Sequence, residues 1–308
     1  METMPACKGA DMELRTLRYF LALTEEGTVS GAAKALHVTQ PTLSRQLSDL
    51  EKEFGKRLFD RGSKRVKLTD DGVRLRDYAR SIVALADKAS SELMQPEQAV
   101  SGDVYIGCGE SDAMRIVLRA MDACKKKHPL VKFHLFSGTS ADLNDRFKDG
   151  LLDFVVEFEL AGHVDCEILK LPVTDVWGVL MRRDDPLAQC DAVRPQDLLG
   201  KRIIGSRQGI KSGKMREWMG AEIQAIDVVV TYNLVGNAAL AVEEGLGVAV
   251  AYDNLVRISP QGVLCFRPLD PPLASDVGVI WKKHRRLSNA AAAFLADLRT
   301  ECERATSA

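Results

Sequence analysis

The feature that most constrains this chain is a change in hydrophobic period near residue 100. Before this point apolar residues recur every three or four positions, a spacing typical of amphipathic helices. From Gly102 onward short apolar runs alternate with helical stretches, which favours parallel strands covered by helices on both faces. A chain of 308 residues is long enough for two or three domains, so we expect a helical N-terminal unit followed by an α/β unit.

Three short helices are predicted within residues 14–54. The first covers Leu14 to Leu23 and ends toward Gly27, and Ser30 is a candidate N-cap for the second. The third opens at residues 39–41, with a threonine cap and a proline in its first turn. Its apolar positions then follow at helical spacing: Leu43, Leu47, Leu50 and Phe54.

The second and third of these helices, joined by a short turn at residues 37–38, form a helix-turn-helix. Two short strands and the basic tip at residues 62–65 follow, and such a wing suits phosphate contact. Arginine, glutamine, serine and threonine can bond base edges or phosphates in a major groove. The candidate DNA contacts are Ser30, Thr39, Gln40, Pro41, Thr42, Ser44, Arg45, Gln46, Arg61, Lys64 and Arg65. An ordinary helical bundle with a polar surface is the alternative.

The distribution of charge favours DNA binding, although the formal net charge is only −1. Residues 12–94 hold 15 basic and 12 acidic side chains, whereas residues 95–308 hold 26 basic and 29 acidic ones. Within residues 30–68 nine basic side chains accompany four acidic ones. A total near zero argues against a protein that coats nucleic acid indiscriminately, but it permits binding at a site through a local basic surface.

A single long helix is predicted from about Asp70 to Leu93, with Thr69 as its cap. Its apolar residues approach a heptad repeat, which favours pairing with a second copy of the chain. Packing against the chain's own N-terminal unit is the alternative. The candidate dimer contacts are Leu75, Tyr78, Ile82, Leu85 and Ala89.

The C-terminal part is predicted to form two strand-helix halves with a cleft between them. Ligands in such folds bind near the carboxyl ends of the strands. By that position the candidate effector contacts are Cys108, Ser111, Gly138, Thr139, Ser140, Ser206, Arg207, Gln208, Tyr232 and Asn233. Simple helix capping is the alternative role for Ser111 and Ser140.

Four acidic residues also fall near the expected cleft, namely Glu110, Asp112, Glu157 and Glu159. If they face it, a carboxylate ligand meets repulsion of order 1 kcal/mol or more per close pair. Polar neutral and cationic ligands therefore remain open alternatives to an anion.

Residues Glu13 to Gly72 resemble the winged helix of the LysR-type transcriptional regulators. The resemblance rests on residues 32–36, on Thr39-Gln-Pro-Thr-Leu-Ser-Arg-Gln46, on Leu58-Phe59 and on Leu68-Thr-Asp-Asp-Gly72. A looser resemblance extends to Arg304, through Asp197-Leu-Leu-Gly200 and Val242-Glu-Glu-Gly-Leu-Gly-Val-Ala249 among other segments.

This resemblance implies a winged helix-turn-helix at 12–69, a linker helix at 70–95 and an effector domain at 101–308. The effector domain is expected to be two-lobed and periplasmic-binding-protein-like (type 2), with one lobe at about 101–172 and 275–308 and the other at 173–274. The implied partners are a double-stranded DNA operator, a small-molecule effector and the chain itself, as homodimer or homotetramer. We therefore expect a bacterial-type regulator of transcription.

Other classes of protein fit the sequence less well. Residues 106–113 begin like a dinucleotide fingerprint, but Asp112 stands where a third glycine is needed. We expect no catalysis, cofactor or metal. Two alternatives remain: a redox-sensing regulator acting through a cysteine such as Cys108, and an enzyme of binding-protein-like fold fused to a helix-turn-helix. The chain has seven separated cysteines, no apolar run of ~18 residues and no signal peptide, so we expect a reduced, cytoplasmic protein without membrane contact.

Overall fold

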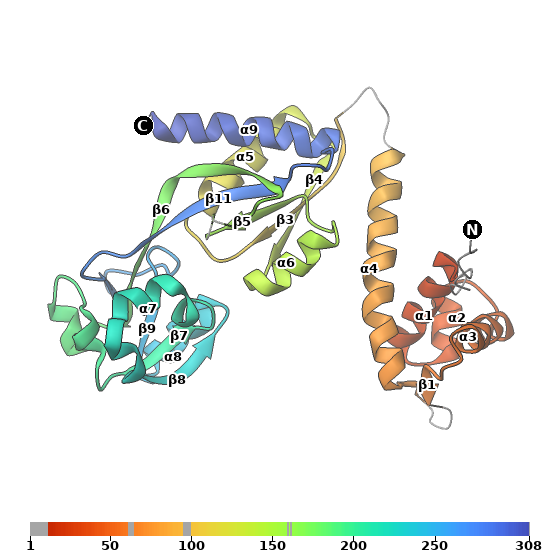
Figure 1. Ribbon diagram of the computed structural model, residues 1–308, viewed down its shortest axis with the longest axis horizontal. Helices are drawn as coiled ribbons and strands as arrows, with labels where there is room; N and C mark the ends of the chain where they lie inside the picture. Colours follow the sequence, from red (N-terminus) through yellow and green to blue (C-terminus); the bar gives the residue numbers. More distant parts are fainter. Residues whose placement is uncertain (1–11, 61–64, 95–99, 159, 161, 308) are drawn as a thin grey trace, which may run out of the picture. The chain divides into compact units, whose positions relative to one another are not determined.

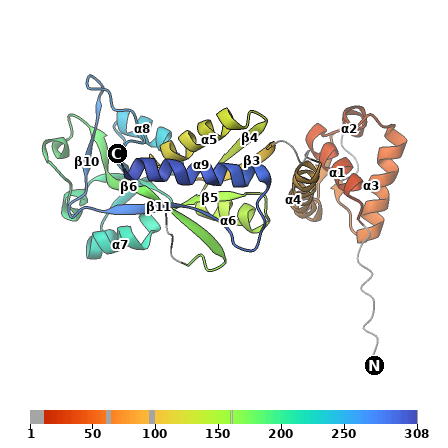
Figure 2. The same ribbon diagram turned by 90° about the horizontal axis from the view of Figure 1, so that it is seen from above.

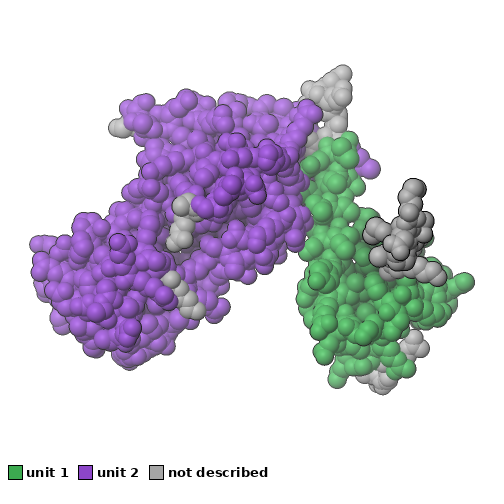
Figure 3. Space-filling model, in the orientation of Figure 1, with its two compact units in different colours: residues 1–93 green, residues 94–308 purple. Residues whose placement is uncertain are grey.

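The computed structural model describes residues 12–60, 65–94, 100–158, 160 and 162–307. It divides into two compact units, residues 1–93 and 94–308, coloured separately in Figure 3. Across the described residues no helix is both long and apolar enough to cross a membrane.

The first unit is helical, with one small hairpin (Figure 1). Its elements are α1 (Leu14–Glu26), α2 (Val29–Ala35), α3 (Gln40–Phe54), β1 (Phe59–Asp60), β2 (Lys67–Leu68) and α4 (Asp70–Leu93). The helices share one core, in which Phe20 of α1, Leu43 of α3 and Ala79 of α4 are fully buried. The predicted winged helix-turn-helix and the long helix after it are therefore confirmed.

Capping side chains explain where the short helices begin. Thr39 Oγ1 accepts the amide N–H of Thr42 at 3.3 Å at the start of α3, as predicted. The expected cap of α2 is wrong: Thr28, rather than Ser30, accepts the amide N–H of Gly31 at 3.1 Å. Ser30 lies inside the helix, because α2 begins at Val29, two residues earlier than a cap at Ser30 would place its start.

The hairpin is anchored to the helices by backbone groups. Glu51 Oε1 on α3 accepts the amide N–H groups of Leu58 at 2.8 Å and of Phe59 at 3.3 Å. The amide of Val66 donates to the carbonyl oxygen of Gly27, the residue that ends α1 in the left-handed region, at 2.8 Å. These bonds set the wing against the two ends of the helix-turn-helix.

The second unit contains one nine-stranded sheet. Its strands are β3 (Gly102–Cys108), β4 (Val131–Ser137), β5 (Phe154–Glu157), β6 (Cys166–Arg182), β7 (Arg202–Ser206), β8 (Asp227–Tyr232), β9 (Val248–Tyr252), β10 (Leu264–Pro268) and β11 (Ala274–Lys282). Its α-helices are α5 (Met114–Lys127), α6 (Ser140–Lys148), α7 (Gly213–Met219), α8 (Val235–Glu243) and α9 (Asn289–Thr306). Short 3-10 helices occupy Pro186–Gln189, Pro195–Leu198, Gly209–Lys211 and Gly220–Gln224.

Helices cover both faces of the sheet in each half of this unit (Figures 1 and 2). In the first half α5 and α9 pack on one face of β3, β5 and β11, and α6 packs on the other. In the second half α7 covers one face of β6, β7 and β9, and α8 covers the other. The two-lobed α/β architecture is therefore confirmed.

The sheet is mixed, so the expectation of parallel sheets is correct only in part. The strand order is β4-β3-β5-β11-β6-β9-β7-β8, and β10 pairs with β6. Pairs formed by β3 and β7 are parallel, whereas β6 pairs antiparallel with β11, β9 and β10. The reason is that β6, of 17 residues, runs from the first half into the second, and β11 leads the chain back.

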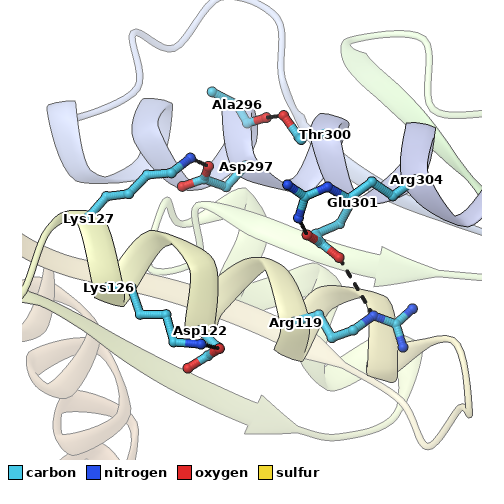
Figure 4. A network of polar contacts seen from close by, with 9 residues as sticks. All are labelled: Arg119, Asp122, Lys126, Lys127, Ala296, Asp297, Thr300, Glu301 and Arg304. Atoms are coloured by element: carbon cyan, nitrogen blue, oxygen red, sulfur yellow. Dashed lines mark hydrogen bonds and ion pairs between the residues drawn. The ribbon is translucent and has the colours of Figure 1, made fainter.

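Ion pairs join α5 to α9 across the first half (Figure 4). Asp297, whose side chain is only 6 % exposed, pairs with Lys127. Glu301 accepts from Arg304 at 2.7 Å and pairs with Arg119 at 3.7 Å. On the outer surface of α5, Lys126 and Asp122 form an exposed pair at 2.6 Å.

Candidate functional site

The start of α3 presents exposed polar side chains. The exposed residues among the candidate DNA contacts are Ser30, Thr39, Gln40, Pro41, Thr42, Ser44, Arg45 and Arg65. The Arg45 side chain is 84 % exposed, and its ion-pair partner Asp49 lies 3.9 Å away, one turn further along the helix. The first turn of α3 holds no acidic side chain, so its amide groups favour phosphate. Arg61 and Lys64 lie outside the described residues.

Gln46 differs from its neighbours on α3. It is half-buried, and its Oε1 accepts the hydroxyl of Thr16 on α1 at 3.4 Å. This contact ties the third helix to the first, so Gln46 is turned partly toward the protein rather than fully toward solvent.

The long helix α4 has two different faces. Leu75 and Val83 pack against the core of the first unit, where Ala79 is fully buried. The alternative of packing on the chain's own domain therefore holds for that face, and Leu75 belongs to it. The other four candidate dimer contacts are exposed, together with Leu93: Tyr78, Ile82, Leu85 and Ala89.

A cavity of about 540 Å³ lies within the second unit. Eight of the ten candidate effector residues line it: Gly138, Thr139, Ser140, Ser206, Arg207, Gln208, Tyr232 and Asn233. They come from the carboxyl ends of β4, β7 and β8 and from the loops that follow, which is the position predicted for ligand contacts. Two of the four acidic residues, Glu110 and Glu157, also line it.

Two candidates lie away from this cavity. Ser111 is buried, accepts the amide N–H of Ala113 at 3.0 Å and bonds the carboxyl of Asp175. The capping alternative is wrong for Ser111, because the N-cap of α5 is Ala113 and no side chain caps that helix. Burial raises the pKa of Asp175, and burial likewise raises the pKa of the Cys108 thiol, which packs in the core beneath α5. A thiol held protonated and out of solvent is poorly suited to redox sensing.

Asp112, the third of the four acidic residues, does not line the main cavity. Asp112 and Asp175 line a separate, smaller cavity of about 280 Å³. Glu159 lies outside the described residues. Across the described residues no group of three or more histidine, cysteine or acidic side chains could hold a metal ion.

The sequence did not indicate several residues that line the main cavity: Gly109, Asn144, Phe158, His163, Trp177, Gly209, Ser212, Ala251, Tyr252 and Leu255. Trp177 and Tyr252 are opposite each other in the β6–β9 pair, and their rings lie 4.2 Å apart. Phe158 stacks on Tyr252 at 5.6 Å. This aromatic wall depends on long-range strand pairing, which spacing along the chain does not reveal.

Glu110 connects the two lobes across the cavity. Its Oε2 accepts the amide N–H of Val235, the first residue of α8, at 2.6 Å. Burial raises the pKa of Glu110, and the bond from Val235 opposes that rise. Burial, with the nearby Glu110, also raises the pKa of Tyr232, whose hydroxyl donates to the carbonyl oxygen of Val250 at 2.9 Å.

On the opposite side the start of α6 faces the cavity. Thr139 and Asp142 form a reciprocal capping box. The hydrogen bonds from Thr139 hold the pKa of Asp142 below its usual range, with Arg146 and Arg207 contributing.

Known families match nearly the whole chain. The family described as bacterial regulatory helix-turn-helix protein, lysR family, matches residues 14–73, and the LysR substrate binding domain matches residues 97–303. A transcriptional regulator of Escherichia coli K12, YbhD, is 25 % identical over 92 % of this chain and 90 % of its own length. The transcriptional activator IlvY of Salmonella typhimurium is 32 % identical over 47 % of this chain and 49 % of its own length.

Solved structures show the same fold. CbnR, a LysR family transcriptional regulator, superposes with a TM-score of 0.73 and 19 % identity, covering 94 % of this chain and 99 % of that one. CbnR complexed with its target DNA superposes with a TM-score of 0.71 and 20 % identity, covering 94 % and 100 %.

Proposed function

Because the chain belongs to the LysR family of transcriptional regulators, we propose that α3 contacts its operator and that the 540 Å³ cavity binds the effector. The observation that carries the proposal is the cavity itself, where eight residues chosen by their position after strands come together from both lobes. Its volume lies within the range of small-molecule sites.

On the DNA side, Gln40, Thr42, Ser44 and Arg45 would meet the major groove. Their exposure and the absence of acidic groups in the first turn of α3 support this assignment. Arg65 on the wing would meet phosphate. The exposed face of α4, formed by Tyr78, Ile82, Leu85 and Ala89, would pair with a second copy, so that two recognition helices address one site.

The DNA assignment can be tested by fluorescence anisotropy on an operator selected from a random duplex library. Arg45→Ala is expected to weaken binding by about 1 to 3 kcal/mol. Arg115→Ala removes a comparably exposed arginine from α5 in the effector unit and serves as the matched control. Equal affinity of the Arg45 variant and the control would remove Arg45 from the interface.

The effector assignment can be tested by thermal shift of the full chain against a metabolite library. Gln208 lines the cavity and is exposed, so Gln208→Trp adds bulk there without overpacking a core. Compounds that act in the cavity should lose their shift in this variant and should change operator affinity only in the wild type. Shifts that survive Gln208→Trp would place the ligand elsewhere.

Homologues are regulators of transcription, and we propose that this chain likewise performs no catalysis. The cavity wall carries no nucleophile paired with a general base among the described residues. Finding turnover of a bound compound, by mass spectrometry of the ligand after incubation, would contradict this.

A further inference from the structure

The helix α8 begins at Val235 without a cap from its own segment of the chain. Leu234 occupies the N-cap position, where its side chain makes no capping hydrogen bond, and the first turn holds no acidic residue. The first amide groups of a helix have no acceptor within the helix, and a buried N–H without a partner costs free energy. Val235 is buried, so its amide needs an acceptor from elsewhere in the fold.

Glu110 of the first lobe supplies this acceptor. Its Oε2 lies 2.6 Å from the amide nitrogen of Val235, a residue 125 positions further along the chain. A carboxylate at a helix N-terminus forms a charge-assisted hydrogen bond and interacts favourably with the helix dipole. The cap that most helices take from an adjacent residue is therefore provided here by the opposite lobe.

Each partner of this bond is fixed to its own lobe. Glu110 follows β3 by two residues, and the backbone beside it packs closely, since a Cβ on Gly109 would meet the Phe158 ring at 2.7 Å. In the second lobe, α8 packs through Ala238 and Val242 on a core that includes residues of β6, β7 and β9. Neither group can follow the other when the lobes separate, so the bond forms only when they are close together.

A second contact between the lobes is tied to the strands that cross between them. Phe158 stacks on Tyr252 at 5.6 Å. The Tyr252 hydroxyl donates to Ser275 Oγ at 3.0 Å, and Trp177 Nε1 donates to the same oxygen at 3.2 Å. Trp177 and Ser275 belong to β6 and β11, the crossing strands, so this contact lies at the hinge and can persist while the lobes pivot. The bond from Val235 to Glu110 joins a helix to a loop outside those strands, and pivoting breaks it.

From this geometry we propose that Glu110 is a latch between the lobes, which holds the cleft closed in the chain without effector. Opening would take the α8 amide and the Glu110 carboxylate apart and remove the cap of the helix, so the equilibrium between open and closed lobes favours the closed form. Because the chain itself satisfies the Val235 amide, no ligand group is needed for closure. The inference goes beyond the proposed effector site, and its test uses no ligand.

Single-molecule energy transfer in the full chain measures the balance between closed and open lobes. Dyes attached through unnatural amino acids at Asp145 on α6 and Glu217 on α7 report on one lobe each, and both sites are exposed. The wild type is expected to populate mainly the closed state without added ligand. Glu110→Ala should raise the ratio of open to closed molecules by about tenfold or more, because it removes a charge-assisted hydrogen bond.

Val235→Pro removes the other partner of the bond. Proline has no N–H and is well tolerated at the first position of a helix. Leu234 already has the extended backbone that a residue before proline prefers, with φ −126° and ψ 124°. This variant should therefore fold and should shift the ratio in the same direction. The double variant should stay within about threefold of either single variant, because each change alone removes the whole bond.

Ser288→Ala is the matched control, because it removes a helix cap that lies within one lobe. Ser288 Oγ accepts the amide N–H of Ala291 at the start of α9, at 3.2 Å. Its loss should lower the melting temperature and leave the ratio of open to closed molecules unchanged. An unchanged ratio in both Glu110→Ala and Val235→Pro overturns the inference, and so do factors that multiply in the double variant. The metabolite screen with Gln208→Trp decides the effector site independently of these results.

Discussion

Replacing Gly72 with alanine would test how the long helix is joined to the wing. A Cβ at this position would lie 2.2 Å from the carbonyl oxygen of Leu58, more than 1 Å inside the 3.4 Å at which ordinary contact begins. The obstacle is backbone, so it cannot rotate away. The same oxygen accepts the amide N–H of Thr69 at 3.1 Å, and a methyl group must therefore displace β1 or the start of α4.

The cost follows from these contacts. Overpacking at a fixed backbone costs about 1 to 3 kcal/mol, and loss of the Thr69 bond adds about 1 kcal/mol. The better helix propensity of alanine returns about 0.5 to 1 kcal/mol. We expect Gly72→Ala to lower the free energy of unfolding of the first unit by about 2 to 3 kcal/mol.

Calorimetry of the full chain, with hydrogen exchange to assign the transitions, measures this loss. A unit of this size loses about 4 to 8 °C per kcal/mol, so its transition should fall by about 10 °C or more. Gly236→Ala is the matched control, because that helical glycine of α8 has open space around it and should tolerate or gain from the methyl group. If the transition of the first unit keeps its temperature in Gly72→Ala, the steric reasoning is refuted. Gly72→Ala should also lower operator affinity, because Leu58, whose carbonyl oxygen the methyl group displaces, directly precedes strand β1 of the wing.

Three further predictions follow from the described contacts. Ile82→Asp, on the exposed face of α4, should shift sedimentation velocity toward a smaller species, whereas Val263→Asp, at a somewhat more exposed site in a loop, should not; an unchanged distribution would remove this face from the interface. Asp297→Ala should lower the free energy of unfolding of the second unit by about 1 kcal/mol, because it removes the partly buried ion pair with Lys127 that joins α5 to α9, against about 0 to 0.5 kcal/mol for Asp122→Ala in an exposed pair; equal urea midpoints would contradict the difference. Since burial raises the pKa of the Cys108 thiol, its alkylation by iodoacetamide, located by peptide mass spectrometry, should stay slow in the folded protein at pH 7 to 8 and become fast in urea; fast labelling of Cys108 itself in the native chain would revive a redox role.

Capping residues, glycines and apolar spacing in the sequence correctly predicted the helices whose ends are fixed by interactions between nearby residues. The caps at Thr39 and Thr69, the glycine stop at residue 55 and the leucine spacing of α3 give that helix and the start of α4 correctly. Ser30 failed as a cap because Thr28 competes for the same turn two residues earlier. Two equivalent hydroxyls at nearby positions leave a cap undecided until the surrounding helices pack.

The strand that crosses between the lobes could not be predicted in the same way. Residues 166–176 form the first part of β6. Most of these residues are not buried, so the segment lacks the apolar run of a central strand, and its pairing with β11 joins residues about a hundred positions apart. The antiparallel character of the sheet therefore became visible only in the folded chain.

The residues that line the cavity also fall into a group that the sequence predicted and a group that depends on long-range strand pairing. Its polar residues follow strands, so position after a strand predicted most of them, including Gly138, Arg207 and Tyr232. Its aromatic residues lie within or just beyond strands that meet only through the crossing of β6, and Trp177 opposite Tyr252 is the clearest case. The sequence thus indicated most of the polar residues of the proposed effector site, whereas the folded chain was needed to show the aromatic surface beside them.

For the DNA-binding unit, the local charge near the contact matters more than the net charge of the whole chain. At physiological salt the Debye length is about 8 Å, so the attraction to phosphate depends on side chains near the contact and little on the rest of the chain. The relevant count is that of residues 30–68, with nine basic and four acidic side chains, rather than the −1 of the whole protein. Pairing through α4 would bring two such surfaces to one operator, and each neutralised phosphate would add to the salt dependence of binding. A chain that is nearly neutral overall can therefore bind its operator with a steep dependence on salt.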